Sequence, residues 1–226
     1  MATTMAQSVA AGFTQYAYAF VAFEAEKTES VNAKAAFVLR ERAARLYGRA
    51  HRHAMRALEL SAPGFSAALR QPDPKQHPRL TQSQVPLAYW AAASLGGWIS
   101  MSKDDPDLVA DLPLSMRLAT LAWQTQPEFG QGALASLMGT LELARPGGVR
   151  ERALQYFDQA IEVSQGQAAG PWVAKAEGWA VDQQDRQAFV RWLDKALQVS
   201  AGKRDLSSQI MRERAQWLLS QVDSIF

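Results

Sequence analysis

The pattern of hydrophobic and polar positions predicts helices along the whole chain. Apolar residues recur every three or four positions, which is the spacing of one helix face. Residues 5–24 are expected to form a first helix, on which Phe13, Tyr16, Phe20 and Phe23 make an aromatic stripe. No run of alternating apolar and polar residues is long enough to indicate a strand. The sequence therefore predicts an all-α fold.

A second, longer helix is predicted over residues 33–60, with Asn32 as its N-cap. Its apolar seam is made mostly of alanines, with arginines between them: Ala36, Leu39, Ala43, Leu46, Ala50, Ala54 and Ala57. Small side chains let two helix backbones approach closely, so this seam calls for an antiparallel partner. The first helix, with its aromatic residues, is the natural one. Residues 5–70, including a short helix near 64–70, are expected to form an atypical N-terminal helical hairpin.

Residues 71–86 form a proline-rich loop that contains Pro72, Pro74, Pro78 and Pro86. Proline lacks an amide hydrogen and forces extended backbone on its neighbours. An ordered loop or lid is expected here, and a plain connector between the hairpin and the remaining chain is the alternative.

The sequence LAYWAAASLGGWISMSKDD, residues 87–105, predicts a buried helix that ends near Ser102. It is too apolar for a surface helix and shorter than the ~18 apolar residues of a membrane span. The pair Gly96 and Gly97 leaves room for a close neighbour, either another helix or a ligand. Asp104 and Asp105 suit the N-terminus of the next helix, because their charge opposes the helix dipole.

The second half of the chain repeats itself weakly. Further helices are expected to about residue 124, with an interruption near Pro113, over residues 127–143, after a turn at residues 145–149, and over residues 170–181, 185–199 and 207–223. In the helix after that turn, Ala153, Phe157 and Ala160 follow the small–aromatic–small spacing of the second helix of a repeat. Ala122, Ala160 and Ala196 occupy equivalent positions, 38 and 36 residues apart. That period is close to the ~34 residues of a tetratricopeptide repeat. Residues 87–226 are therefore expected to form degenerate tetratricopeptide-like hairpins stacked in an α-α superhelix, within one domain of residues 1–226.

Composition narrows the possible chemistry. The net charge of +2 and the arginines spread over helix faces favour solvated surfaces, so no nucleic-acid partner is expected. The chain has no cysteine, which excludes disulfides and thiolate chemistry. His51 and His53 are two apart on a helix and point to different faces, so they cannot chelate one metal ion. Asp182 and Asp185 could hold a cation, but helix capping explains them. We expect no catalytic residue, no metal and no cofactor.

Tryptophans and tyrosines are the main candidates for ligand contact. The candidate ligand-binding residues are Tyr89, Trp90, Trp98 and Lys103, which flank the glycine pair. Ligand sites are mostly apolar with a few placed polar groups. The alternative is that these aromatic residues simply pack helices in the core.

Three segments together resemble the TRAP transporter T-component family. They are LYGRAHRHAMRALEL (46–60), YWAAASLGGWISMSKDD (89–105) and TQPEFGQGALASLMGTLELARPGG (125–148). The resemblance implies a periplasmic, usually lipid-anchored protein of cryptic tetratricopeptide-like repeats. It also implies a homotrimer, a periplasmic solute-binding protein as partner, and a cleft for a small hydrophobic ligand.

The start of the chain bears on its compartment. MATTMAQSVAAGF lacks the layout of a signal peptide, and there is no cysteine for lipid attachment. A cytoplasmic protein and a mature chain without its export signal both fit. The rival functions are a generic tetratricopeptide-like scaffold that grips a peptide and, with only the proline-rich loop in support, a helical enzyme.

Overall fold

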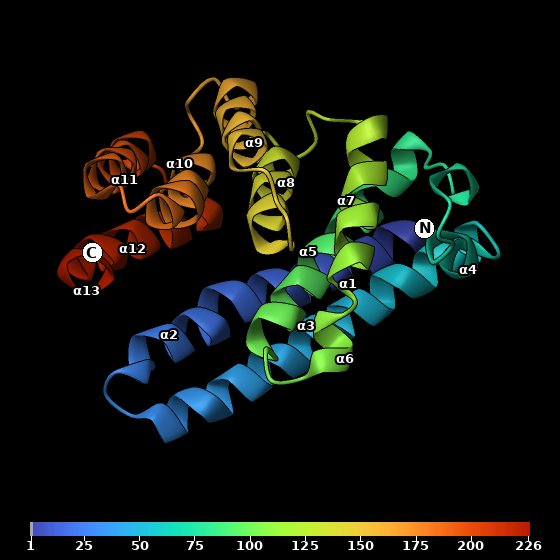
Figure 1. Ribbon diagram of the computed structural model, residues 1–226, viewed down its shortest axis with the longest axis horizontal. Helices are drawn as coiled ribbons and strands as arrows, with labels where there is room; N and C mark the ends of the chain where they lie inside the picture. Colours follow the sequence, from blue (N-terminus) through green and yellow to red (C-terminus); the bar gives the residue numbers. More distant parts are fainter. Residues whose placement is uncertain (1) are drawn as a thin grey trace. The chain divides into compact units, whose positions relative to one another are not determined.

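The computed structural model describes residues 2–226, with side chains from residue 4 onward. This part of the chain contains helices and turns and no strand, so the all-α prediction is confirmed. The helices form two compact units, of which the first ends at Gln126 and the second spans Pro127–Phe226. Figure 1 shows both units along the chain. The superhelix and the single domain stay predictions.

Seven α-helices make up the first unit. They are α1 (Ala2–Tyr16), α2 (Phe23–Glu29), α3 (Ala33–Ser61), α4 (Phe65–Leu69), α5 (Val85–Met101), α6 (Pro106–Val109) and α7 (Leu112–Thr125). A π-helical segment, η1 (Ala17–Ala22), joins α1 to α2 without a break. The helices α5 and α7, which the sequence grouped with the repeats, thus belong to the same unit as the N-terminal hairpin.

The predicted antiparallel pairing of the first two long helices is confirmed. Asn32 caps α3, because its side chain accepts a hydrogen bond from the Ala35 amide at 3.0 Å. Phe13 of α1 stacks on His53, whereas Glu29 at the end of α2 pairs with Arg40 near the start of α3. The earlier residue of the first helix contacts the later residue of α3, and the later residue contacts the earlier one. The two helices are therefore antiparallel.

The predicted aromatic stripe runs from α1 through η1 into α2 and is packed only in part, because Phe23 is 3% exposed but the middle of the stripe is not the packed face. Ala10, Thr14 and Ala17 are buried, whereas Tyr16 is 43% and Phe20 is 51% exposed. Small side chains let α1 and α3 approach closely. The space between the two helices is then too narrow for the Tyr16 and Phe20 rings, which lie beside the interface instead. The π-helical turn that begins at Ala17 also shifts the phase of the residues after it.

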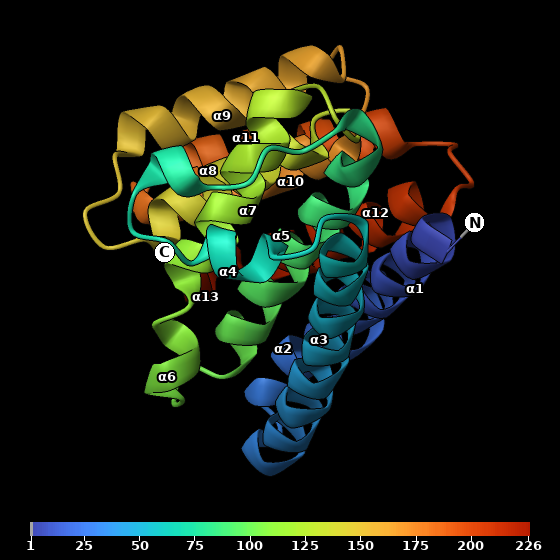
Figure 2. The ribbon, with the colours of Figure 1, turned by 90° about the vertical axis from the view of Figure 1, so that its right-hand side faces the viewer.

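Helix α5 lies between α3 and α7, as Figures 1 and 2 show. Near one end of the α3–α5 contact, Gln84 donates a hydrogen bond to the Ser61 hydroxyl at 2.9 Å. From the other side, the Ser115 hydroxyl of α7 donates to the Ala92 carbonyl at 2.9 Å. The predicted buried helix is therefore present. It begins at Val85, so the predicted loop of residues 71–86 ends two residues early, and it ends one residue before Ser102.

The proline-rich loop contains two short 3-10 turns, η2 (Pro74–Gln76) and η3 (Gln82–Gln84). Asp73 caps the first turn, and the Gln84 side chain accepts from the Thr81 amide at 2.9 Å. The loop is thus an ordered one. After α5, Asp105 caps α6, and the helix is interrupted at residues 110–111 before α7, close to the predicted break.

The second unit contains helical pairs. Its helices are α8 (Ala133–Ala144), α9 (Arg150–Val163), α10 (Ala169–Lys175), the π-helical η4 (Ala176–Ala180), α11 (Arg186–Ser200), α12 (Leu206–Ser220) and α13 (Val222–Ile225). The prediction that Pro127 begins a helix is wrong, since α8 starts at Ala133. Gly130, Gln131 and Gly132 have positive φ angles, which a right-handed helix excludes.

Phe157 of α9 joins successive pairs in the second unit. Its ring occupies the space beside Gly139 of α8, where an added Cβ would lie 2.8 Å away. The same ring lies against Gly178 of η4, where an added Cβ would lie 2.9 Å away. Ala153 and Ala160 are fully buried on the same face of α9. The predicted small–aromatic–small pattern therefore packs as expected.

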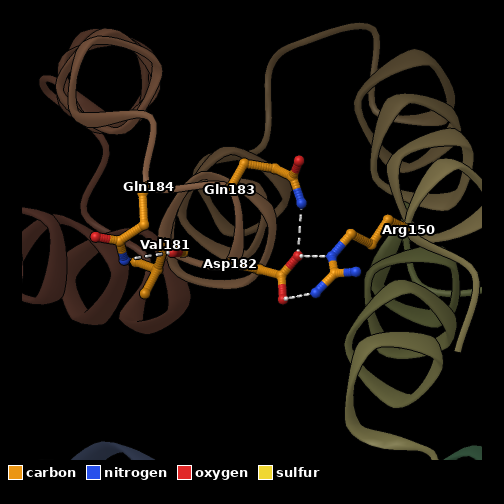
Figure 3. A network of polar contacts seen from close by, with 5 residues as sticks. All are labelled: Arg150, Val181, Asp182, Gln183 and Gln184. Atoms are coloured by element: carbon orange, nitrogen blue, oxygen red, sulfur yellow. Dashed lines mark hydrogen bonds and ion pairs between the residues drawn. The ribbon is translucent and has the colours of Figure 1, made fainter. Parts of the chain in front are cut away.

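Polar contacts tie the ends of these helices together. Arg150 at the start of α9 donates to the Asp182 carboxylate at 2.6 Å, as Figure 3 shows. This ion pair, with a second bond from Gln183, lowers the pKa of Asp182. Asp185 caps α11 by accepting from the Ala188 amide at 2.8 Å. Capping is confirmed for Asp185, whereas Asp182 serves as the partner of an arginine.

Candidate functional site

One face of α3 organises the candidate site in the first unit. Gly48, Arg52, Met55 and Glu59 follow the spacing that brings residues onto one helix face. The Trp98 indole covers Gly48, where an added Cβ would lie 3.1 Å from the ring. The Arg52 guanidinium lies 5.8 Å from the centre of the same ring, a cation–π contact.

Gly97 is the point of closest approach between α5 and α3. A Cβ at this position would lie 2.6 Å from the Tyr47 ring, so only glycine fits without movement. Tyr47 itself is buried in a cluster with Ala17, Val21 and Ala43. At Gly97, the close neighbour expected from the sequence is therefore the facing helix.

The four predicted ligand-binding residues do not converge on one point. The Tyr89 and Trp90 rings meet edge to face, 4.8 Å apart, and burial raises the pKa of Tyr89 to about 12. Trp98 lies eight residues further along α5, which is ~12 Å along the axis. Lys103 is exposed in the turn after α5. Their role in ligand binding stays a prediction.

A pocket of about 260 Å³ opens beside Arg52. It is lined by residues of α3, α4 and α7 and by the residue after α4: His51, Arg52, Met55, Ser66, Leu69, Arg70 and Leu114. Met55, Leu69 and Leu114 supply apolar surface, and the two arginines and the histidine supply polar groups. The volume lies just below the usual range of ~300–1,000 Å³ for ligand pockets, so the pocket suits only a small organic molecule.

Hydrogen bonds fix the wall of this pocket. Glu59 accepts from the Gly64 and Ser66 amides at 2.6 and 2.8 Å, and these bonds lower the pKa of its carboxyl. Arg117 of α7 donates to the Leu69 carbonyl at 3.0 Å. The short helix α4 is therefore held from both α3 and α7, so the pocket has a defined shape.

His51 connects the pocket to α5. Its Nδ1 lies 2.9 Å from the Ala91 carbonyl oxygen. A carbonyl can only accept, so Nδ1 carries the hydrogen and donates it. Burial lowers the pKa of His51, and the hydrogen bond to Ala91 opposes that shift only in part. At neutral pH the imidazole is therefore neutral, and Arg52 and Arg70 carry the positive charge of the pocket.

A second pocket, of about 310 Å³, lies where α2 and η1 meet α3 and the end of α5. It is lined by Ala22, Ala25, Glu26, Glu29, Arg40 and Met101. Glu29 and Arg40 form an ion pair with each other at its rim. The remaining lining is mainly apolar. Neither pocket is lined by Tyr89, Trp90, Trp98 or Lys103.

The described residues contain neither a metal-binding cluster nor a membrane-spanning helix. No group of three or more histidine or carboxylate side chains in this part of the chain is placed to hold a metal ion. None of the helices described here has the length and apolar character to cross a bilayer.

Comparison with known proteins decides the family. The profile of the TRAP transporter T-component matches residues 2–226. The chain belongs to the TRAP transporter T-component family. This T-component is also 24% identical, over 224 residues, to an uncharacterised protein of Treponema pallidum (strain Nichols). That match covers 95% of this chain and 69% of the relative.

Family membership confirms the resemblance carried by the three sequence segments. It makes this T-component an accessory component of a TRAP transport system, which is not an enzymatic role. Trp98, which the sequence suggested, contacts Arg52 but lines neither pocket, and sequence reasoning missed the pocket residues His51, Met55 and Arg70. One sequence feature could have indicated His51 and Met55: both lie beside the alanine seam of the long helix, on a face that also carries polar residues.

Proposed function

We propose that this T-component acts in the periplasm by binding the solute-binding protein of a TRAP system. The observation that carries the proposal is the family match, which extends over residues 2–226. The proposal includes assembly as a homotrimer, which light scattering of the purified protein measures directly.

Co-purification tests the partner. The solute-binding protein encoded beside this T-component should be retained by the immobilised T-component at micromolar concentration. A solute-binding protein from an unrelated transporter serves as the control. Retention of neither protein would contradict the proposal and favour the rival, a tetratricopeptide-like scaffold that grips a peptide.

We further propose that a small, largely hydrophobic ligand binds in the first unit. The pocket beside Arg52 supports this, because the apolar side chains Met55, Leu69 and Leu114 and the polar groups of His51, Arg52 and Arg70 line one half-open pocket. Arg52 lines the pocket and also contacts the Trp98 ring. Of the four predicted residues, Trp98 is therefore the one whose fluorescence should change most when a ligand binds. Tyr89, Trp90 and Lys103 are proposed only as residues of the same helical region.

A thermal-shift screen of small apolar molecules and organic acids tests the ligand. A binder should raise the unfolding temperature of the wild type and change its tryptophan fluorescence. Met55→Trp fills the pocket and should abolish both effects, whereas a change at the exposed residue Leu206 should preserve them. A binder that acts equally on Met55→Trp would place the ligand elsewhere.

A further inference from the structure

Helix α3 carries a row of exposed arginines, of which only Arg52 also lines the pocket described above. Arg42, Arg45, Arg49, Arg52 and Arg56 are separated by three, four, three and four residues, and all five are exposed. This spacing keeps side chains on one face of a helix. Arg42 and Arg56 are fourteen positions apart, which is ~21 Å along the axis. We call these five residues the arginine row.

Apart from Glu41, which lies beside Arg45, the surroundings of the row leave its charge uncompensated. The packed helices α1 and α5 contain no charged residue within Ala2–Tyr16 and Val85–Met101. Glu41 lies 3.9 Å from Arg45 and is itself half exposed. Among the described residues, no carboxylate forms an ion pair with Arg49, Arg52 or Arg56. The row is therefore a local concentration of positive charge on a chain whose net charge is only +2.

Aromatic rings on both flanks hold the guanidinium groups in place. The Arg49 guanidinium lies 5.4 Å from the centre of the Phe13 ring, and Arg52 lies over Trp98. Arg42 donates to the Tyr16 hydroxyl at 3.4 Å. Cation–π contacts restrict an arginine side chain before binding, so less conformational entropy is lost when it binds a partner. Three of the five arginines are thus partly ordered before any partner arrives.

The geometry points to the acidic face of a protein as the partner of the arginine row. All five positions are arginine and none is lysine, and the planar guanidinium matches a carboxylate through two parallel hydrogen bonds. Arginine and large aromatic residues are also the most common energetic anchors of protein interfaces. Tyr16 and Phe20, both exposed, provide such aromatic surface on the neighbouring helix.

We infer that the arginine row is the surface through which this T-component docks on its solute-binding protein, whose contacting face is acidic. This inference rests on the proposed function. Phospholipid headgroups and nucleic acids would also attract the row, but attraction to a charged surface requires only positive charge, which lysine supplies equally well. The exclusive use of arginine and its fixed orientation favour carboxylates on a folded partner.

Calorimetry with matched variants tests the inference. Arg45→Gln with Arg49→Gln removes two charges from the row, and Arg191→Gln with Arg204→Gln removes two from exposed positions of the second unit. The row variant should bind the solute-binding protein at least about tenfold more weakly, and the control should stay within about twofold. Arg45→Lys with Arg49→Lys keeps the charge and should weaken binding by several-fold, since the paired hydrogen bonds are lost.

Salt dependence gives a second measurement. Between about 50 and 300 mM salt, the affinity of the wild type should fall more steeply than that of the row variant. Circular dichroism of each variant checks that the fold is retained.

The outcomes separate the two proposals. If the wild type binds but the row variant binds equally well, the arginine row is not the docking surface, while the proposed function stands. If the wild type does not bind its solute-binding protein, the proposed function fails and this inference fails with it. Row-dependent binding to phosphatidylglycerol vesicles or to a single-stranded oligonucleotide, with unchanged binding of the protein, would assign the row to a different partner and overturn the inference.

Discussion

Gly97 controls how closely α5 approaches α3, because the Tyr47 ring occupies the space where a larger residue would place its first carbon. Gly97→Ala should therefore destabilise the protein by ~1–3 kcal/mol through overpacking. Gly12 on α1 is a matched control, since a Cβ added there would meet no atom within 4 Å. Gly12→Ala should be neutral or stabilising by up to ~1 kcal/mol. Urea unfolding of both variants measures the difference, and equal stabilities would contradict the contact.

His51 makes stability depend on pH. Its pKa in the folded protein lies below the usual value of 6.5, so the unfolded chain takes up a proton first as the pH falls. The stability from neutral His51 is present above about pH 6.5 and is lost as the pH falls below that value. His51→Asn keeps a donor for the Ala91 carbonyl without a titrating group. Between pH 7.5 and 5.5, the unfolding temperature of this variant should fall less than that of the wild type. An equal fall would contradict the assignment of this pH dependence to His51.

At the scale of elements, local sequence rules predicted the helices and several of their ends. Asn32 and Asp185 have short polar side chains directly before apolar periodic segments, and both cap helices. Features that depend on neighbours could not be predicted. The π-helical segment Ala17–Ala22 has no local sequence signal, and the exposure of Phe20 follows from the close approach of alanine-rich backbones.

The second unit depends on a largely buried ion pair between its helices. Arg214 of α12 donates to the Glu177 carboxylate of η4 at 2.9 Å, and the Arg214 side chain is 8% exposed. Glu177→Ala leaves this cation without its partner carboxylate and should cost about 3 kcal/mol or more. Arg150→Ala breaks an exposed pair and should cost less than ~1 kcal/mol. Thermal unfolding of the two variants compares the costs; similar values would show that Glu177 does not compensate a buried charge.

At the scale of the whole molecule, the order of three sequence segments was enough to indicate the family, and the profile match confirms it. The candidate site was harder to predict. The lining of the pocket combines residues from α3, α4 and α7, and only folding brings Met55, Leu69 and Leu114 together. The arginine row was visible as a spacing in the sequence, but its significance depends on the uncharged helices that flank it.

The central claim is that this T-component binds the solute-binding protein of a TRAP system, and isothermal titration calorimetry measures that binding most directly. The two purified proteins, titrated at low salt, should give a saturable heat with a dissociation constant in the micromolar range or below, ~8 kcal/mol of binding free energy. The absence of any saturable heat at concentrations tenfold above that range, with both proteins folded, would contradict the claim.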